Sequence, residues 1–579
     1  MGFTSKWLLG VAYTGAYLTL FVVAMQQHVV MAMTPYITSG FSSHSLIPVI
    51  SQMAFIILGI VSLAVSRLVD LWGLAQGFGL MVLATILGAW FSGLLLMMFC
   101  RNIEMYTAAV VSSPSDCLIL DWLPTLIFSS QVIHEIGYGG ILYTLLVFVT
   151  QNAKFKYRPL AIAFTKVPYI ATTFAGPRAA EAFYNRGLTK WAFGSFAIIL
   201  PSIAGPLFCI LLYNQSKMSA TSSFLESHNQ QVKSGFFGTL LRYLKDFDVV
   251  GISLACVGLT LFLLPFNLAA TGLNGWGSAT IISMILVGLT LLVLLVLYES
   301  FIAPTKFLPF ELLRDRVVWG ACLSVCGVYT SLFCWFSYFT SHLQVVHNMG
   351  IGEAGYLANT NYVGTGVAAV VAGICMRYLG RARTTTLAAL TIYTLGTGMM
   401  IQFTSSGSPS ALGGIIASQV LISLSAGIHA VGANIGALDG ASQSTLSMRL
   451  ALVYLSSMIG SSIALAISGA IWTNTLPGRL ASNLAGLGLT SQEETSIYGS
   501  LIVQLSYDVG TPVRDAIIRS YRGVFRILMI VATATSVVSW VGALMMRDIT
   551  AGDRDAKEEE SELEQSHQTR GDTAAISEK

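Results

Sequence analysis

Long apolar runs, separated by mostly short polar gaps, dominate the pattern of this chain. A helix needs about 20 predominantly apolar residues to cross a bilayer, and fourteen runs meet that requirement. They lie at 7–29, 46–66, 76–99, 131–150, 158–182, 189–213, 247–270, 278–299, 317–338, 354–376, 384–403, 411–432, 449–472 and 523–545. The pattern predicts an all-α polytopic membrane protein with fourteen transmembrane helices.

Basic residues differ between successive gaps and predict the orientation of the chain. Gaps after even-numbered runs are rich in Lys and Arg, whereas four gaps after odd-numbered runs contain neither (30–45, 271–277, 339–353 and 404–410). Arg101, the 178–190 region and the 473–522 gap depart from this asymmetry. Because basic loops stay in the cytoplasm, both termini are expected to be cytoplasmic and the 473–522 gap to face outward.

Composition supports this class and argues against several others. Of the 579 residues, 54% are hydrophobic and 10% are charged, with a mean hydropathy of +0.70. Soluble proteins carry about 25% charged residues. The net charge of +3 gives no reason to expect a nucleic-acid partner. The eight cysteines lack zinc or redox spacing, and no nucleophile triad or Walker loop occurs. We therefore expect no enzyme activity, no cofactor and no metal site.

A short motif recurs in the two halves of the chain. Asp70 and Gly73 follow the second run, and Arg377, Gly380 and Arg381 follow the tenth in the same register. Tight turns bearing charges can clamp helix ends at a cytoplasmic gate, and two repeated halves suit alternating access. The expected organisation is a first half at 1–213, a loop at 214–246, two linker helices and a loop at 247–316, a second half at 317–545 with an external loop at 473–522, and a disordered acidic cytoplasmic tail at 546–579.

One region interrupts the first half. The pieces 103–110 and 131–149 would join into one good span, and the segment 111–131 separates them. This atypical insert is either a re-entrant excursion or a translated intron. Its Val-Ser start and Gln end fit splice-site codons, so we favour the intron.

Ionisable and aromatic side chains within the runs are candidates for function. Glu135 is the candidate proton-coupling group, since desolvation disfavours its charged form; the alternative is a structural ion pair. His28 either borders an outer cavity or marks the end of the first helix. Trp335, Tyr338 and Phe339 either line a cavity for a bulky ligand or form an interfacial aromatic belt. Other intramembrane ionisable residues are His134, Arg178, Glu181 and Glu299.

The long 473–522 gap has the features of folded structure. Pro477 is expected to close the thirteenth helix. Thr490 with Glu493 predicts a capped short helix, and Thr511 with Pro512 predicts the start of another. We expect two or more short amphipathic helices over the outer mouth.

The repeat, the turn motifs and the fourteen runs together resemble the major facilitator superfamily over the chain to residue 546. The first-half turn of that family usually has a glycine ahead of Asp-x-x-Gly-Arg. Here Asp70 and Gly73 match, but Ser66 and Leu74 stand at the first glycine and at the basic position. This departure weakens the expected clamp in the first half.

The external segment resembles one branch of that superfamily. The stretches SGAIWTNTLPGRL, QLSYDVGTPVRDAI and SYRGVFR, with DVVGISLACVGLTLFLLPFNLA earlier, are similar to fungal siderophore–iron transporters. The resemblance implies a symporter of ferric hydroxamate siderophores and protons, in which Tyr498, Tyr507, Arg514 and Tyr521 of the external segment handle substrate. Because the iron arrives chelated, no protein metal site is implied.

The same resemblance sets the expected location and the rival functions. It implies a monomer in a lipid bilayer, in the fungal plasma membrane or alternatively a vacuolar or vesicular one. A drug or glutathione exchanger is the rival within transport, because exporters share the fourteen-helix plan. A non-transporting sensor is the rival outside it.

Overall fold

The computed structural model describes residues 5–548 apart from 41–46, 100–122, 189–190, 222–247, 270–274, 304–311, 313, 380, 407–409 and 442. The described residues form helices and no strand. The earlier helices are α1 (Lys6–Gly40), α2 (Ile47–Trp72), α3 (Leu74–Phe99), α5 (Leu123–Asn152), η2 (Phe155–Tyr157), α6 (Arg158–Phe164), α7 (Pro168–Asn185) and α8 (Trp191–Thr221).

The remaining helices complete the bundle and the segment at its end. They are α11 (Val249–Leu263), α12 (Pro265–Leu268), α13 (Ala279–Phe301), α15 (Arg316–His347), α16 (Ile351–Leu379), α17 (Ala382–Ser405), α18 (Ala411–Ala437), α19 (Gln443–Leu484), α20 (Ser491–Gly499), α21 (Leu501–Ser506) and α22 (Pro512–Met545).

The apolar runs correspond to these helices. Within the described residues, ten helices are long and apolar enough to cross a membrane. These include α1, α8, α13 and α22. The protein is therefore an all-α polytopic membrane protein, and the count of fourteen crossings stays a prediction. Residues 111–122 of the atypical insert lie outside the described residues, as does the tail after Asp548.

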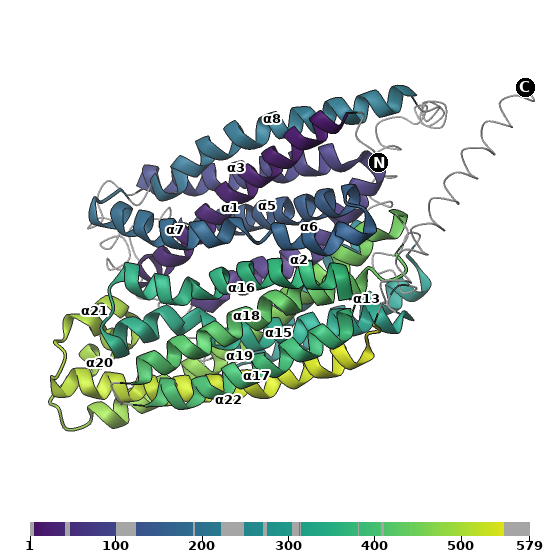
Figure 1. The fold of residues 1–579 in the computed structure, drawn as a ribbon. Coiled ribbons are helices and arrows are strands. Elements are labelled where there is room, and N and C mark those ends of the chain that lie inside the picture. The colour runs from purple at the N-terminus through teal and green to yellow at the C-terminus, as the bar shows by residue number, and fades with distance from the viewer. Residues whose placement is uncertain are drawn as a thin grey trace, which may run out of the picture.

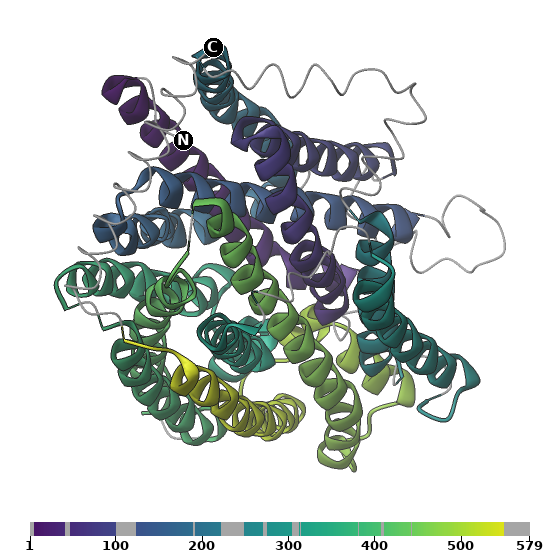
Figure 2. The same ribbon diagram turned by 90° about the vertical axis from the view of Figure 1, so that its right-hand side faces the viewer.

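The helices form two groups that meet along a seam (Figures 1 and 2). In Figure 1, α1 to α8 lie in the upper group and α15 to α22 in the lower one. At the seam, α2 packs along α19, and α6 and α7 pack along α16. Figure 1 also places the start of α1 and the end of α22 at one end of the bundle. Following the predicted orientation, we call that end inner and the opposite one outer.

Glycines allow the close approach of α16 to α6 and α7. A Cβ on Gly355 would lie 2.9 Å from Pro177, and one on Gly373 would lie 3.0 Å from the Pro159 carbonyl oxygen. Both distances are shorter than ordinary van der Waals contact. The glycines at these positions thus set the spacing of the two groups along this part of the seam.

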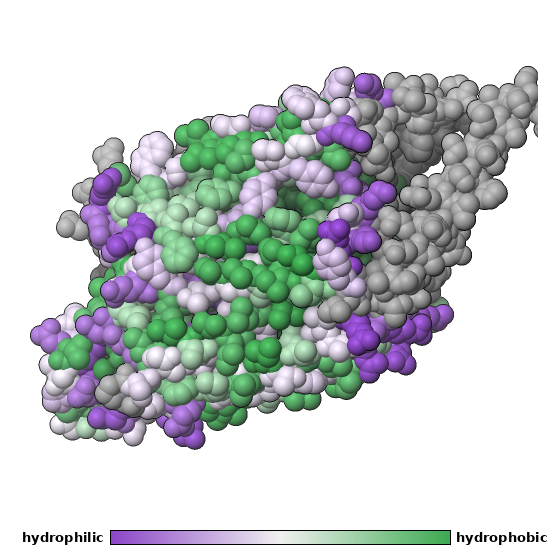
Figure 3. All heavy atoms as spheres, viewed as in Figure 1, coloured by the Kyte–Doolittle hydropathy of each residue, from purple (hydrophilic) through white to green (hydrophobic). Residues whose placement is uncertain are grey.

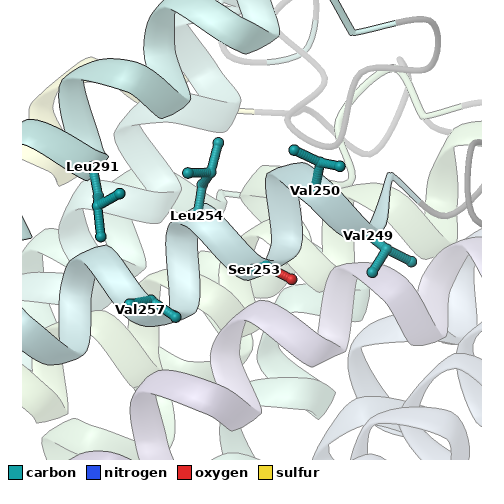
Figure 4. A pocket seen from close by; sticks show the side chains of 6 residues that line it. All are labelled: Val249, Val250, Ser253, Leu254, Val257 and Leu291. Atoms are coloured by element: carbon teal, nitrogen blue, oxygen red, sulfur yellow. The ribbon is translucent and has the colours of Figure 1, made fainter.

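The sides of the bundle, between its inner and outer ends, suit a lipid environment. An apolar band runs between two polar ends in Figure 3. Linker helix α13 shows this at the residue level, because Leu286, Val293 and Val296 are more than half exposed. An open groove between α11 and α13, drawn in Figure 4, is lined by Val249, Val250, Ser253, Leu254, Val257 and Leu291. Its almost entirely apolar lining is of the kind that lipid chains cover.

The two linker helices α11 and α13, with the short helix α12 between them, are joined to the bundle by hydrogen bonds of buried amides. Gln52 on α2 donates a hydrogen bond of 3.1 Å from its Nε2 to the Leu263 carbonyl, and Asn267 donates one of 2.5 Å to Gln52 Oε1. Both side chains are buried. Such bonds are favourable in lipid because neither amide has water as an alternative partner.

The outer end carries the folded segment expected from the sequence. Thr490 and Glu493 form the predicted capping box of α20, and the Thr511 side chain caps α22. The prediction that Pro477 ends the thirteenth helix is wrong, because α19 continues through Pro477 to Leu484. Leu476, Leu480 and Leu484 recur at helical spacing and are buried. Their burial favours continuing the helix despite the proline. We call residues 485–511 the lid.

Candidate functional site

Arg514 joins the lid to the second half of the bundle. It lies in the first turn of α22 and has no exposed surface. Its Nη2 donates to the carbonyls of Gln344 and Val345 at 3.3 and 3.0 Å, and its Nη1 donates to the carbonyl of Gln504. The two α15 carbonyls belong to the last turn of that helix, where carbonyls lack intrahelical partners and carry partial negative charge. Arg514 therefore caps α15 while holding α21.

Tyr521 belongs to the same buried joint. Its hydroxyl donates to Gln504 Oε1 at 2.5 Å, and Gln504 Nε2 donates to the Ile497 carbonyl at 2.6 Å. Its ring meets Trp472 edge-on, with centroids 5.2 Å apart. Of the four residues expected to handle substrate, Arg514 and Tyr521 are thus fully buried in contacts between helices.

Tyr498 and Tyr507 lie differently from the other two. Tyr498 is on α20, and Tyr507 follows α21 as its C-cap residue. Both rings pack against the core of the second half, and both keep some accessible surface. They are the two members of the predicted set that keep accessible surface.

The aromatic residues expected to line a cavity lie beneath this joint. Tyr338 stacks on Trp472, with centroids 3.9 Å apart and planes inclined by 4°. Trp335 meets Phe339 edge-on at 5.0 Å. Tyr338, Trp335 and Phe339 have no exposed surface, so in this conformation their rings contact other side chains.

A second cluster of polar and aromatic residues spans the seam between the two groups. The rings of Tyr169 on α7 and Tyr362 on α16 stack at 5.5 Å, and His28 on α1 meets Tyr362 edge-on at 4.9 Å. His28 Nδ1 lies 3.1 Å from the Thr172 hydroxyl, and the Tyr138 and Tyr169 hydroxyls are 3.1 Å apart. These residues come from four helices of both groups and form the central cluster.

The central cluster leaves polar atoms available for a ligand. Within the described part of the chain, His28 Nε2 in the cluster is buried without a hydrogen-bond partner, as is Oε1 of Gln26, two residues earlier on α1. Burying a polar atom without a hydrogen-bond partner destabilises the fold by about 1–3 kcal/mol, so such atoms are expected to bind water or a ligand. Gly176 gives His28 its place, because a Cβ there would overlap the His28 Cβ. The sequence alternatives for His28 included a cavity position, but Tyr169 and Tyr362 gave no signal beyond being aromatic residues in apolar runs.

Lys166 lies one helical turn inward from this cluster and was not singled out from the sequence. It stands between α6 and α7, within the run 158–182. The signal was present, since an ionisable residue in a membrane span is a functional candidate by default.

Comparison with known proteins adds to this geometry. The family model described as "Fungal trichothecene efflux pump (TRI12)" matches residues 135–557. The chain is 36% identical over 546 residues to the MFS siderochrome iron transporter D of Aspergillus fumigatus, covering 94% of this chain and 86% of that protein. It is 36% identical over 524 residues to the siderophore iron transporter mirB of Emericella nidulans, covering 89% and 80%. Among solved structures, a bacterial homolog of the human lysosomal transporter Spinster is 12% identical, with a TM-score of 0.49 over 93% of this chain and 98% of that one.

The chain belongs to the fungal siderophore–iron transporter family of the major facilitator superfamily. Its fold class is the major facilitator fold, and it is a transport protein, not an enzyme.

The predicted gate of this siderophore–iron transporter family member is partly described. Arg377 at the inner end of α16 lies over the Tyr157 ring, 4.4 Å from its centroid, and its Nη2 donates to the Tyr157 hydroxyl at 3.3 Å. Gly73 makes the turn between α2 and α3 with φ +97°. Arg381 is exposed at the start of α17. The Asp70 side chain and Gly380 lie outside the described residues.

Two further points concern protons and metal in this family member. Glu135 lies on α5, and its side chain is outside the described part. Its neighbour His134 is described, with Nε2 2.6 Å from Gln26 Nε2 on α1.

Among the described residues, no group of three His, Cys, Asp or Glu side chains could hold a metal ion.

Proposed function

We propose that this protein carries ferric hydroxamate siderophores across a fungal membrane together with protons, by alternating access between its two groups of helices. The observation that carries the proposal is the 36% identity to a siderochrome iron transporter over 94% of the chain. Iron is the cargo in this proposal and enters already chelated.

The central cluster supports a binding role for the seam. A ferric hydroxamate complex presents oxygen atoms and apolar chains, which suit tyrosine hydroxyls, aromatic faces and the unpartnered atoms of His28 and Gln26. The cluster also takes side chains from both groups, so a ligand held there would contact both. We assign Tyr498 and Tyr507 the first contact with substrate, because they keep accessible surface on the lid side. Trp335, Tyr338 and Phe339 become contacts only if the joint opens.

Proton coupling is assigned to the outer half of the α1–α5 contact. Glu135 is our coupling group, and His134 with Gln26 provides polar neighbours on the adjoining helix. The carrier is proposed to act as a monomer in the plasma membrane, with a vacuolar or vesicular membrane as the alternative, and with cytoplasmic termini.

Uptake of radiolabelled ferric hydroxamates by an iron-starved fungal strain without its own carriers tests this function. We expect accumulation that rises as external pH falls and collapses with a protonophore. Glu135→Gln should remove concentrative uptake, and unchanged pH dependence in that variant would refute the Glu135 assignment. Absence of uptake of every hydroxamate would refute the function.

Export is the second candidate, because the matching family model is named for an efflux pump. The same strain, preloaded with labelled siderophore, separates the two. Faster loss of label than in the carrier-free strain, without uptake, would favour export.

A further inference from the structure

Lys166 places a cation well inside the apolar part of the bundle. It lies eight residues beyond Arg158, which begins α6 at the inner end, and its backbone N–H donates to the Ala163 carbonyl at 3.0 Å. The junction of α6 and α7 at this point interrupts the helix, and Pro168 begins the next one. An ammonium at this depth is expensive in a membrane protein unless something pairs with it.

The Lys166 ammonium has no such partner among the described residues. No hydrogen bond or ion pair between described residues involves its side chain. Two other buried cations of the bundle have partners: Arg449 lies 3.7 Å from Asp315, and Arg514 donates to carbonyls. In contrast to these two cations, Lys166 has no partner among the described residues that would offset the free-energy cost of removing its charge from water.

The surroundings of Lys166 place it at the seam between the two groups of helices. A Cβ on Gly366 of α16 would lie 3.1 Å from the Lys166 carbonyl oxygen, so the two backbones touch across the seam. Tyr362 lies one turn outward from Gly366 on α16, and Tyr169 lies one turn outward from Lys166. Lys166 and Tyr362 are enclosed by neighbouring helices yet keep accessible surface. A ligand that moves between the two groups of helices in the proposed transport cycle would pass these side chains.

We infer that Lys166 gives the translocation site a positive charge that selects ferric chelates carrying a free carboxylate or another net negative charge. The inference rests on the proposed function and deepens it by naming the charge class of the substrate. An anionic complex held on the inner side of the central cluster would supply the counter-charge that the described residues do not provide. A cationic complex would be repelled by the same group.

A series of chelates with one iron-binding core tests this selectivity. Ferrioxamine B carries a free ammonium, its N-acetyl derivative is uncharged, and its N-succinyl derivative carries a carboxylate. Initial uptake of the three labelled complexes is measured in cells making wild-type, Lys166→Gln, Lys166→Arg or Lys154→Gln protein. Lys154 is an exposed lysine at the inner end and serves as the matched control. Ratios between complexes within one variant do not depend on how much protein is made.

We expect the wild type, Lys166→Arg and Lys154→Gln to favour the succinyl complex over the acetyl one by roughly tenfold. That factor is the effect of one unit charge about 10 Å away at an effective dielectric constant of about 20. Lys166→Gln should carry both complexes equally. An unchanged order in Lys166→Gln would overturn the inference while leaving the transport function intact. An equal fall in the uptake of all three complexes would also overturn it, because a residue that carries the coupling proton would affect every complex alike. Failure of the wild type to carry any of the three would refute the inference, whereas the proposed function fails only if no other hydroxamate is carried.

Discussion

Arg514 shows how a buried cation can be stabilised without a carboxylate. Its guanidinium donates hydrogen bonds to three carbonyls, two of them in the last turn of α15. Guanidinium donors are fixed in a planar fork, so they can satisfy carbonyls from two segments at once. The lid segment α21 and the helix α15 are thereby joined through one side chain.

Replacing Arg514 should therefore loosen the lid. Arg514→Ala removes bonds between a charged donor and carbonyls, each worth about 1.5–3 kcal/mol, and leaves buried acceptors behind. We expect a lower melting temperature of the purified protein and faster protease cleavage within 485–511. Arg519→Ala is the matched control, because Arg519 is exposed on the same helix. Equal effects of the two substitutions would contradict the role of Arg514.

At this scale the sequence could single out residues such as Arg514 but could not predict what they contact. Arg514 stood out as an arginine in a polar segment, but its acceptors on α15 are about 170 residues away in the chain. Periodicity carries no information about such pairs, because partners depend on how helices pack. The same limit applies to Tyr169 and Tyr362, whose stacking exists only across the seam.

At the scale of elements, apolar periodicity located the helices because lipid requires every backbone polar group to be bonded within its own segment. The predicted run 449–472 lies within α19, but the helix continues beyond Pro477, where Leu480 and Leu484 are buried. In this case the free energy gained by burying these leucines outweighs the helix-breaking tendency of the proline. Capping signals fared better, since Thr490 and Glu493 interact with each other and need no distant partner.

The packing of α16 on α6 gives an element-scale prediction. Gly373→Ala would press a methyl group on the backbone of Pro159 and Leu160, at 3.0 and 3.1 Å. Backbone cannot rotate away, so the helices must separate, and we expect a lower melting temperature with slower siderophore uptake. Gly398→Ala on α17 is the control, because nothing lies within 4 Å of its added Cβ. That substitution should be neutral or stabilise by up to about 1 kcal/mol through helix propensity. Equal melting temperatures of the two variants would count against close packing at Gly373.

At the scale of the whole molecule, contacts across the seam hold both ends together in this conformation. At the outer end, Phe174 on α7 lies 6.2 Å from Tyr356 on α16, measured between ring centroids. At the inner end, Tyr143 donates to the Ser447 carbonyl at 2.8 Å, and Arg377 lies over Tyr157. In the proposed alternating-access cycle, opening either end requires the loss of its own set of contacts, so each set would bias the equilibrium between the two open states.

The inner contact of Arg377 gives a prediction for that equilibrium. A partly exposed cation–π pair is worth about 0.5–1 kcal/mol, so Arg377→Ala should raise the inward-open population by roughly two- to fivefold relative to the closed one. Spin labels on the inner ends of α6 and α16 would report this as a larger share of long distances. Tyr157→Phe is the matched control, because it keeps the ring under Arg377 and removes only the hydroxyl acceptor of the 3.3 Å hydrogen bond. It should shift the distances less than Arg377→Ala does. If Arg377→Ala leaves the distance distribution of the wild type unchanged, the contact does not contribute to closing the inner end, and the gate must rest on the packing of α5 and α6 against the second group.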